Sequence, residues 1–108
     1  MDMNAYQAAA NETAIFPPDQ GIVYTALGLA SEAGEVTDKV KKVIRDSGGD
    51  FSSEAREGIK KELGDVLWYV SSLARELGFT LEEVAEANIL KLSSRFDRDM
   101  IGGSGDER

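Results

Sequence analysis

The sequence contains no cysteine and no histidine, and these two absences exclude several kinds of chemistry. Without cysteine there is no disulfide, no thiolate nucleophile and no sulfur ligand for zinc or an iron–sulfur cluster. Without histidine there is no imidazole base and no imidazole metal ligand. Any bound metal ion must therefore be held by oxygen atoms, which suit hard ions such as Mg²⁺, Mn²⁺ or Ca²⁺. Water is then the expected nucleophile in any reaction that the chain catalyses.

Basic residues are scarce as well, because 12 Lys and Arg stand against 20 Asp and Glu, giving a net charge of −8. This balance argues against a nucleic acid polymer as partner, since such proteins normally present a basic patch. A small phosphorylated ligand screened by metal ions stays compatible with it. No apolar run reaches the roughly 20 residues that cross a bilayer, so no membrane partner is expected. The first residues lack the features of a secretory signal, which predicts a cytoplasmic location.

Proline occurs only at Pro17 and Pro18, and the remainder of the chain has helical periodicity without strand-like alternation. A short helix is expected over about residues 3–13, and a long one from near Ile22 to the breaker at residues 46–50. Ser52 or Ser53 should cap a third helix that ends before Gly78. Thr80 and Glu83 form a capping box for a fourth. The predicted fold is all-α and four-helix bundle-like, with the second and third helices paired antiparallel.

The 108 residues are long enough for one domain with its own core, expected over residues 1–101, and residues 102–108 should form a flexible tail. Apolar residues at steps of three and four mark the expected core positions of the last three helices. They are Leu29, Ala33, Val36, Val40 and Val43, then Ile59, Leu63, Val66, Val70, Leu73 and Leu77, then Leu81, Val84, Ile89, Leu92 and Phe96.

Two acidic motifs have the same pattern of acid, apolar residue, glycine and acid. They are Glu32-Ala-Gly-Glu35 in the second helix and Glu62-Leu-Gly-Asp65 in the third. Residues three apart lie on one helix face, so each motif projects two carboxylates together. Four carboxylates converging from an antiparallel pair of helices would hold Mg²⁺, with Mn²⁺ as a substitute. No histidine is present for a di-iron site, and no twelve-residue calcium loop occurs.

An alternative interpretation is that these acids form ordinary solvated helix faces, with Lys39 pairing with Glu35 at the surface. Two features weigh against it. Both pairs sit inside their helices, where like charges repel and no positive helix terminus compensates them. Each pair also includes an interior glycine, which costs about 1 kcal/mol relative to alanine. The same unfavourable arrangement in two helices indicates that both acidic pairs serve one functional site.

The ordered set of motifs resembles the MazG-like nucleotide pyrophosphohydrolases. The resemblance rests on the two acidic pairs, separated by 26 residues, and on the strings that contain them, LASEAGEV over 29–36 and KELGDVLWY over 61–69. It extends to Tyr6-Gln7, to Val40-Lys-Lys42 and to residues 87–91 with Arg95, so it covers roughly residues 4–97. Ser31 departs from the pattern, because many relatives carry a glutamate there.

The resemblance implies Mg²⁺-dependent hydrolysis of nucleoside triphosphates, dNTPs above all, to the monophosphate and pyrophosphate, a housecleaning of the nucleotide pool. It implies that Glu32, Glu35, Glu62 and Asp65 bind the metal and carry catalysis, with one of the glutamates as the base. It also implies a homodimer or homotetramer whose sites are completed near subunit interfaces. The substrate-binding residues expected from it are Asn88, Lys91, Arg95, Lys42 and Trp68.

Several interpretations stay open at this point. The stripe of Asn88, Lys91 and Arg95 is also what a solvent-facing side of a helix looks like, and Trp68 could be a packing residue. Tyr6, Gln7 and Phe16 could line a base pocket if the first helix folds over the site. A narrower substrate, such as dUTP or phosphoribosyl-ATP, shares the acidic signature. A non-catalytic acidic helical module that docks a basic partner is the alternative outside enzymes.

Overall fold

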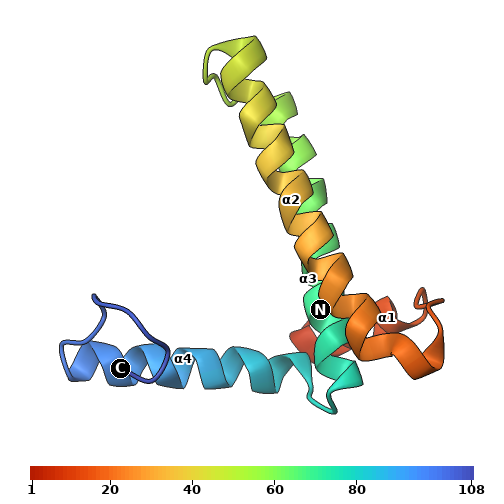
Figure 1. Cartoon of the computed structure of the whole chain (residues 1–108), viewed down its shortest axis with the longest axis vertical. Coiled ribbons are helices and arrows are strands. Elements are labelled where there is room, and N and C mark those ends of the chain that lie inside the picture. The colour runs from red at the N-terminus through yellow and green to blue at the C-terminus, as the bar shows by residue number, and fades with distance from the viewer.

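The computed structural model describes all 108 residues, and its regular structure is entirely helical. The elements are α1 (Met3–Asn11), the short 3₁₀ helix η1 (Pro18–Gln20), α2 (Gly21–Ser47), α3 (Ser53–Glu76) and α4 (Leu81–Asp97). The helices α2 and α3 form a long antiparallel hairpin, α1 packs at its base, and α4 leaves that base pointing away from both long helices (Figure 1). The prediction of an all-α fold with an antiparallel central pair is confirmed.

The helix ends follow the capping residues that the sequence contains. Ser52, rather than Ser53, caps α3, because its hydroxyl accepts from the amide of Ala55 at 3.2 Å. Thr80 and Glu83 form the complete capping box at the start of α4. Gly48 ends α2 in the left-handed conformation, with φ of 59°, which costs glycine little. These local interactions set the two turns that join the last three helices.

A buried glutamine fixes α1 to the turn between α3 and α4. The Gln7 side-chain nitrogen donates to the carbonyl oxygens of Ser71 and Phe79 at 3.2 and 3.1 Å. Its side-chain oxygen accepts from the amide of Leu81 at 3.1 Å. A buried amide is stable only when such partners are present, so Gln7 is a structural residue that holds α1 in place.

The ring of Tyr69 on α3 packs directly against the backbone of α2 at Gly28. A Cβ atom at Gly28 would overlap the Tyr69 ring, so only glycine permits this approach. The glycines inside the acidic motifs, Gly34 and Gly64, behave differently, because a Cβ atom at either would meet nothing. The two motif glycines therefore lie on open surface, and the close approach of the helices occurs elsewhere.

The apolar core of the single chain is small, which differs from the expected core. Only nine of 108 residues are buried, and the apolar ones among them are Ala10, Ala74 and Leu81. Leu63, Leu77 and Phe96, expected in the core, are 54%, 50% and 76% exposed. The expectation of a self-contained core was wrong. The two long helices pack mainly on each other, and α4 has few contacts with the other helices along its length (Figure 1).

The shape of the chain is open for its length. Its radius of gyration is 16.7 Å, whereas a compact domain of this size has about 13 Å. Its accessible surface is 7688 Å², about 1,800 Å² more than size scaling gives for a globular chain of this mass. No helix is both long enough and apolar enough to cross a bilayer.

Gly28→Ala should lower stability by about 1 kcal/mol, because displacing the Tyr69 ring outweighs the helix propensity that alanine gains. Gly58→Ala is the matched control on α3, since its Cβ would make only ordinary contact with Lys39. That control should gain up to about 1 kcal/mol from propensity. Urea unfolding followed by circular dichroism measures both variants. Equal stability changes in the two variants would contradict the close packing at Gly28.

Candidate functional site

Three carboxylates from the two long helices converge at the middle of the hairpin. Carboxylate oxygens of Glu32 on α2 and of Glu62 and Asp65 on α3 all lie within 4.8 Å of one another. These are three of the four acids expected at the metal site. Glu35, the fourth, lies nearly one turn further along α2, is exposed, and stands outside this group.

The electrostatics of this acidic cluster, Glu32, Glu62 and Asp65, favour a cation. Partial burial raises the pKa of Glu32, and the negative charges of Asp65, Glu62 and Glu35 raise it further. A raised carboxyl pKa means that the ionised form is disfavoured where it stands. A cation relieves that repulsion, and a set made only of carboxylate oxygens matches the preference of Mg²⁺ and Mn²⁺. The residues present therefore fit a hard divalent metal ion.

An aromatic hollow of about 360 Å³ adjoins the cluster on the side of the hairpin base. Trp68 lies in it beside two members of the cluster, Glu32 and Asp65. The ring of Phe16 stacks on Tyr24 at 5.3 Å between centroids and meets Trp68 edge-on at 6.5 Å. The other lining residues are Thr13, Ile15, Tyr24, Phe16 and Tyr69.

The indole of Trp68 is anchored in this aromatic hollow. Its ring N–H donates to the hydroxyl of Thr13 at 2.9 Å and to the carbonyl of Ala10 at 3.2 Å. Trp68 is therefore held by the end of α1 and also presents its ring to the hollow. Phe16 lines this hollow because the segment after α1, rather than α1 itself, places it there. Tyr6 and Gln7 are not among the lining residues.

Sequence reasoning did not name Tyr24, Thr13 or Ile15 as site residues. A usable signal existed for Tyr24, which precedes Glu32 by eight residues, or two steps of four along α2. Thr13 and Ile15 lie between α1 and η1, where no periodicity indicates the direction of a side chain. Only the folded position of that segment reveals them.

A hollow of about 620 Å³ lies on the other side of the cluster, toward the turn of the hairpin, and we call it the basic hollow after its three lysines, Lys39, Lys42 and Lys61. Three acids, Asp46, Glu54 and Glu57, also line it. The Lys39 ammonium lies 3.7 Å from a carboxylate oxygen of Glu62, rather than pairing with Glu35, and so links this hollow to the acidic cluster. Sequence reasoning had assigned no functional role to Lys39 or Lys61.

The ammonium groups of Lys42 and Lys41 are partly engaged within α2. They lie 2.8 and 3.0 Å from the carboxylate of Asp38. Their hydrogen bonds lower the pKa of Asp38 to about 2. Both lysine side chains stay more than half exposed, so Lys42 can still reach a ligand in the basic hollow.

The predicted residues of α4 are not brought to the acidic cluster within one chain. Asn88 and Lys91 line a separate hollow of about 520 Å³ next to the turn before α4. Lys91 and Arg95 both pair with Asp106. No residue of α4 lines the aromatic hollow or the basic hollow.

Comparison with known proteins identifies the sequence pattern. Residues 20–98 match the family model of the MazG nucleotide pyrophosphohydrolase domain. The chain is 46% identical to the Gene 37 protein of Mycobacterium phage L5, in an alignment of 114 residues that covers all of both chains. The name of that relative states no activity. No solved structure shows a significant match to the chain.

The repulsion in the acidic cluster can be tested by replacing Glu32 and measuring how the change in melting temperature depends on pH. A carboxyl group with a raised pKa binds its proton more tightly in the folded state, so its ionisation costs stability as the pH rises. In the presence of chelator, Glu32→Gln should therefore melt at a higher temperature than the wild type at pH 7. The difference should shrink as the pH is lowered from 7 to 5, because protonation of the wild-type Glu32 relieves the repulsion.

Glu86→Gln is the control for charge removal, since Glu86 is exposed on α4 and lies outside all the hollows described. Its melting temperature relative to the wild type should not depend on pH in this range. Thermal melts of the three proteins at both pH values provide the measurement. A Glu32→Gln protein that is less stable than the wild type at pH 7 would contradict the repulsion.

Proposed function

The chain belongs to the MazG nucleotide pyrophosphohydrolase family, and from this premise we propose that it hydrolyses nucleoside triphosphates to the monophosphate and pyrophosphate. The proposed substrates are dNTPs above all, the metal is Mg²⁺, and the role is nucleotide-pool housecleaning. The observation that carries the proposal is the order of groups along the hairpin. An aromatic hollow, an acidic cluster and a basic hollow follow one another from its base to its turn.

This order follows from antiparallel pairing. Along α2, Tyr24 precedes Glu32, and Lys39 follows two turns later, about 10 Å further along the axis. Along α3 the order reverses in sequence, with Lys61 before the acids and Trp68 after them. The two helices therefore present the same groups at the same levels. A nucleoside triphosphate has the matching order of an aromatic base at one end and phosphates at the other.

The acidic cluster, together with Glu35, would hold Mg²⁺, with Mn²⁺ as a substitute; when bound, the metal neutralises phosphate charge and polarises the phosphoryl group. Without a cation, these carboxylates would repel a triphosphate. One glutamate of the set accepts the proton of the attacking water, because the chain has no histidine to serve as base. Water adds to the α-phosphorus as the bond to the bridging oxygen breaks and pyrophosphate leaves.

The two hollows that flank the acidic cluster would bind the two ends of the substrate, the aromatic hollow the base and the basic hollow the phosphates. The rings of Phe16, Tyr24 and Trp68 offer faces against which a base can stack, and stacking is worth about 1–3 kcal/mol per base. Lys42 and its neighbours Lys39 and Lys61 provide positive charge for the leaving pyrophosphate. Asp46, Glu54 and Glu57 line the same hollow, so the phosphates would compete with these carboxylates for the lysines.

We also propose that the chain works as a homodimer or homotetramer. The excess surface of about 1,800 Å² per chain is the amount that an obligate interface buries. Large apolar side chains of α4 lie exposed, among them Ile89, Leu90 and Phe96. Asn88, Lys91 and Arg95 can act on a substrate at the acidic cluster only from the α4 of a second chain.

Glu62→Gln should lower turnover about 100-fold or more, because a charge of the metal-binding set is lost while the shape is kept. A panel of ribo- and deoxynucleoside triphosphates, with dUTP and phosphoribosyl-ATP included, measures it, scored for pyrophosphate rather than orthophosphate. Wild-type turnover should stop after chelation and return with Mg²⁺, and Mg²⁺ should raise the wild-type melting temperature.

Glu86→Gln serves as the control and should keep wild-type turnover. Turnover of dUTP or phosphoribosyl-ATP alone would narrow the substrate within the same reaction. Pyrophosphate release that survives exhaustive chelation, or that survives Glu62→Gln, would refute the assignment of the site.

The assembly is tested by light scattering at micromolar concentration, where the wild type should have at least twice the mass of one chain. Ile89→Glu should shift it toward the monomer, because a charge replaces an exposed apolar side chain of the proposed interface. Gln20→Glu, at an exposed polar position of η1, is the control. A wild-type protein that is monomeric at this concentration would contradict the proposal.

A further inference from the structure

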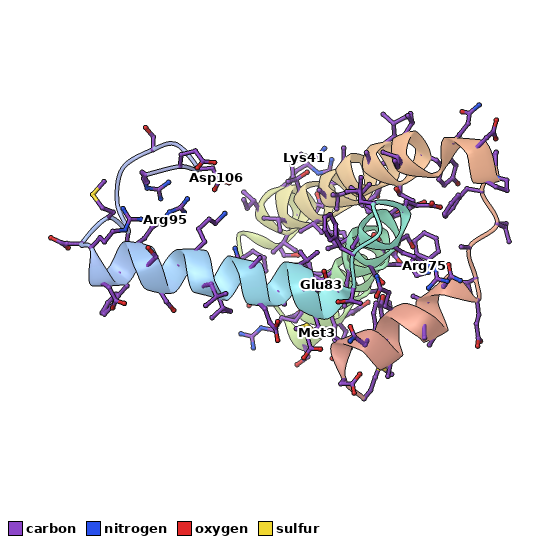
Figure 2. The ribbon with its side chains drawn as sticks, turned by 90° about the horizontal axis from the view of Figure 1, so that it is seen from below. Met3, Lys41, Arg75, Glu83, Arg95 and Asp106 are labelled. Carbon is purple, nitrogen blue, oxygen red and sulfur yellow. The ribbon has the colours of Figure 1, made fainter.

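Two cations on successive turns of α4 share one carboxylate from the end of the chain. A single oxygen of Asp106 lies 2.7 Å from the Lys91 ammonium and 3.0 Å from the Arg95 guanidinium. These hydrogen bonds lower the pKa of the Asp106 carboxyl. The loop that carries Asp106 folds back over the Arg95 end of α4 (Figure 2).

The Arg95 side chain is the most enclosed charge of the molecule's ion pairs. It is only 6% exposed, and its Nε atom is buried without a hydrogen-bond partner. A buried guanidinium normally has all of its donors satisfied, because each missing partner is costly. Asp106 therefore satisfies part of a site whose donors exceed what one carboxylate accepts. Phosphate groups offer more acceptor oxygens than a carboxylate and match the guanidinium geometry equally well.

Besides the Asp106 ion pairs, two hydrogen bonds tie the covering loop to the end of α4. The Arg95 guanidinium donates to the main-chain oxygen of Asp106, and the Arg98 guanidinium donates to that of Arg108. The loop turns back through Gly103 and Gly105, whose φ values are 97° and 88°. The loop holds itself through Arg108, whose guanidinium donates to carbonyls including those of Met100 and Gly102. Asp106 itself stays 75% exposed, so its ion pairs face solvent and contribute little stability.

We propose that Lys91 and Arg95 form a binding site for a phosphate-bearing anion, and that the chain's own Asp106 carboxylate occupies this site until such an anion displaces it. The inference deepens the proposed function, because Lys91 and Arg95 are its expected phosphate-binding residues. The new element is that the Asp106 carboxylate of the same chain competes with the anion for these two residues. The loop over residues 102–108 then leaves α4 when the anion binds, which exposes the Arg95 end of the helix.

Asp106→Asn tests the competition, because it keeps the shape of the side chain and removes its charge. The probes are inorganic pyrophosphate and an α,β-methylene dNTP, titrated by calorimetry with chelator present, so neither the metal nor turnover enters the result. We expect Asp106→Asn to bind pyrophosphate about three- to fivefold more tightly than the wild type. Glu107→Gln removes the same charge from the next residue, which makes no ion pair, and should bind like the wild type.

The double variant Asp106→Asn with Lys91→Met should lose the gain in affinity, which would show that the competition occurs at Lys91. If Asp106→Asn binds both probes more tightly, the ligand is the phosphate chain that they share. If it binds only the methylene analogue more tightly, the ligand is the nucleotide. All of these titrations lack metal and measure binding alone. The inference can therefore fail while the proposed catalytic activity holds, and it can hold while that activity fails.

Nuclear magnetic resonance relaxation on the unmodified chain gives a measurement that needs no variant. The backbone order parameters of Gly103 and Gly105 should be lower at saturating pyrophosphate than in buffer, as the loop is released. Equal affinities of Asp106→Asn, Glu107→Gln and wild type for both probes would overturn the inference. So would unchanged order parameters of the loop at saturation.

Discussion

The repulsion among three carboxylates is the constraint around which this molecule is organised. Glu32, Glu62 and Asp65 bring their oxygens within 4.8 Å, although nothing in the chain itself neutralises them except the ammonium of Lys39. The pairing of α2 with α3 holds their backbones in place, with the Tyr69 ring packed on Gly28. A cation between these carboxylates would relieve their repulsion.

The second constraint is the small amount of apolar surface that one chain can bury. A hairpin of two long helices gives the site its linear order of aromatic hollow, acids and lysines. It also leaves the outer stripes of both helices and most of α4 uncovered (Figure 1). The open shape that gives the proposed site its linear order thus also leaves exposed the apolar surface that the proposed assembly would cover.

Most positive groups near the site already have a negative neighbour. Lys42 lies against Asp38, Lys39 against Glu62, and Lys91 and Arg95 against Asp106, whereas Lys61 makes no ion pair. Such pairing is expected in a chain with a net charge of −8. In the proposed function, a polyphosphate would compete with these internal carboxylates, and its binding would exchange one set of ion pairs for another.

The helices, their caps and the two acidic motifs are predictable from the sequence, because these depend on residues three or four apart along one chain. The absence of cysteine and histidine likewise means that any metal site must be made of oxygen. Which carboxylates converge depends on how α2 packs against α3. Packing also places Tyr24 and Thr13 beside Glu32 and Asp65, Lys61 in the basic hollow, and Asp106 on Lys91 and Arg95. Those contacts join residues on different elements or across an irregular turn, and their geometry depends on how the elements pack and on where the chain reverses, which no local periodicity encodes.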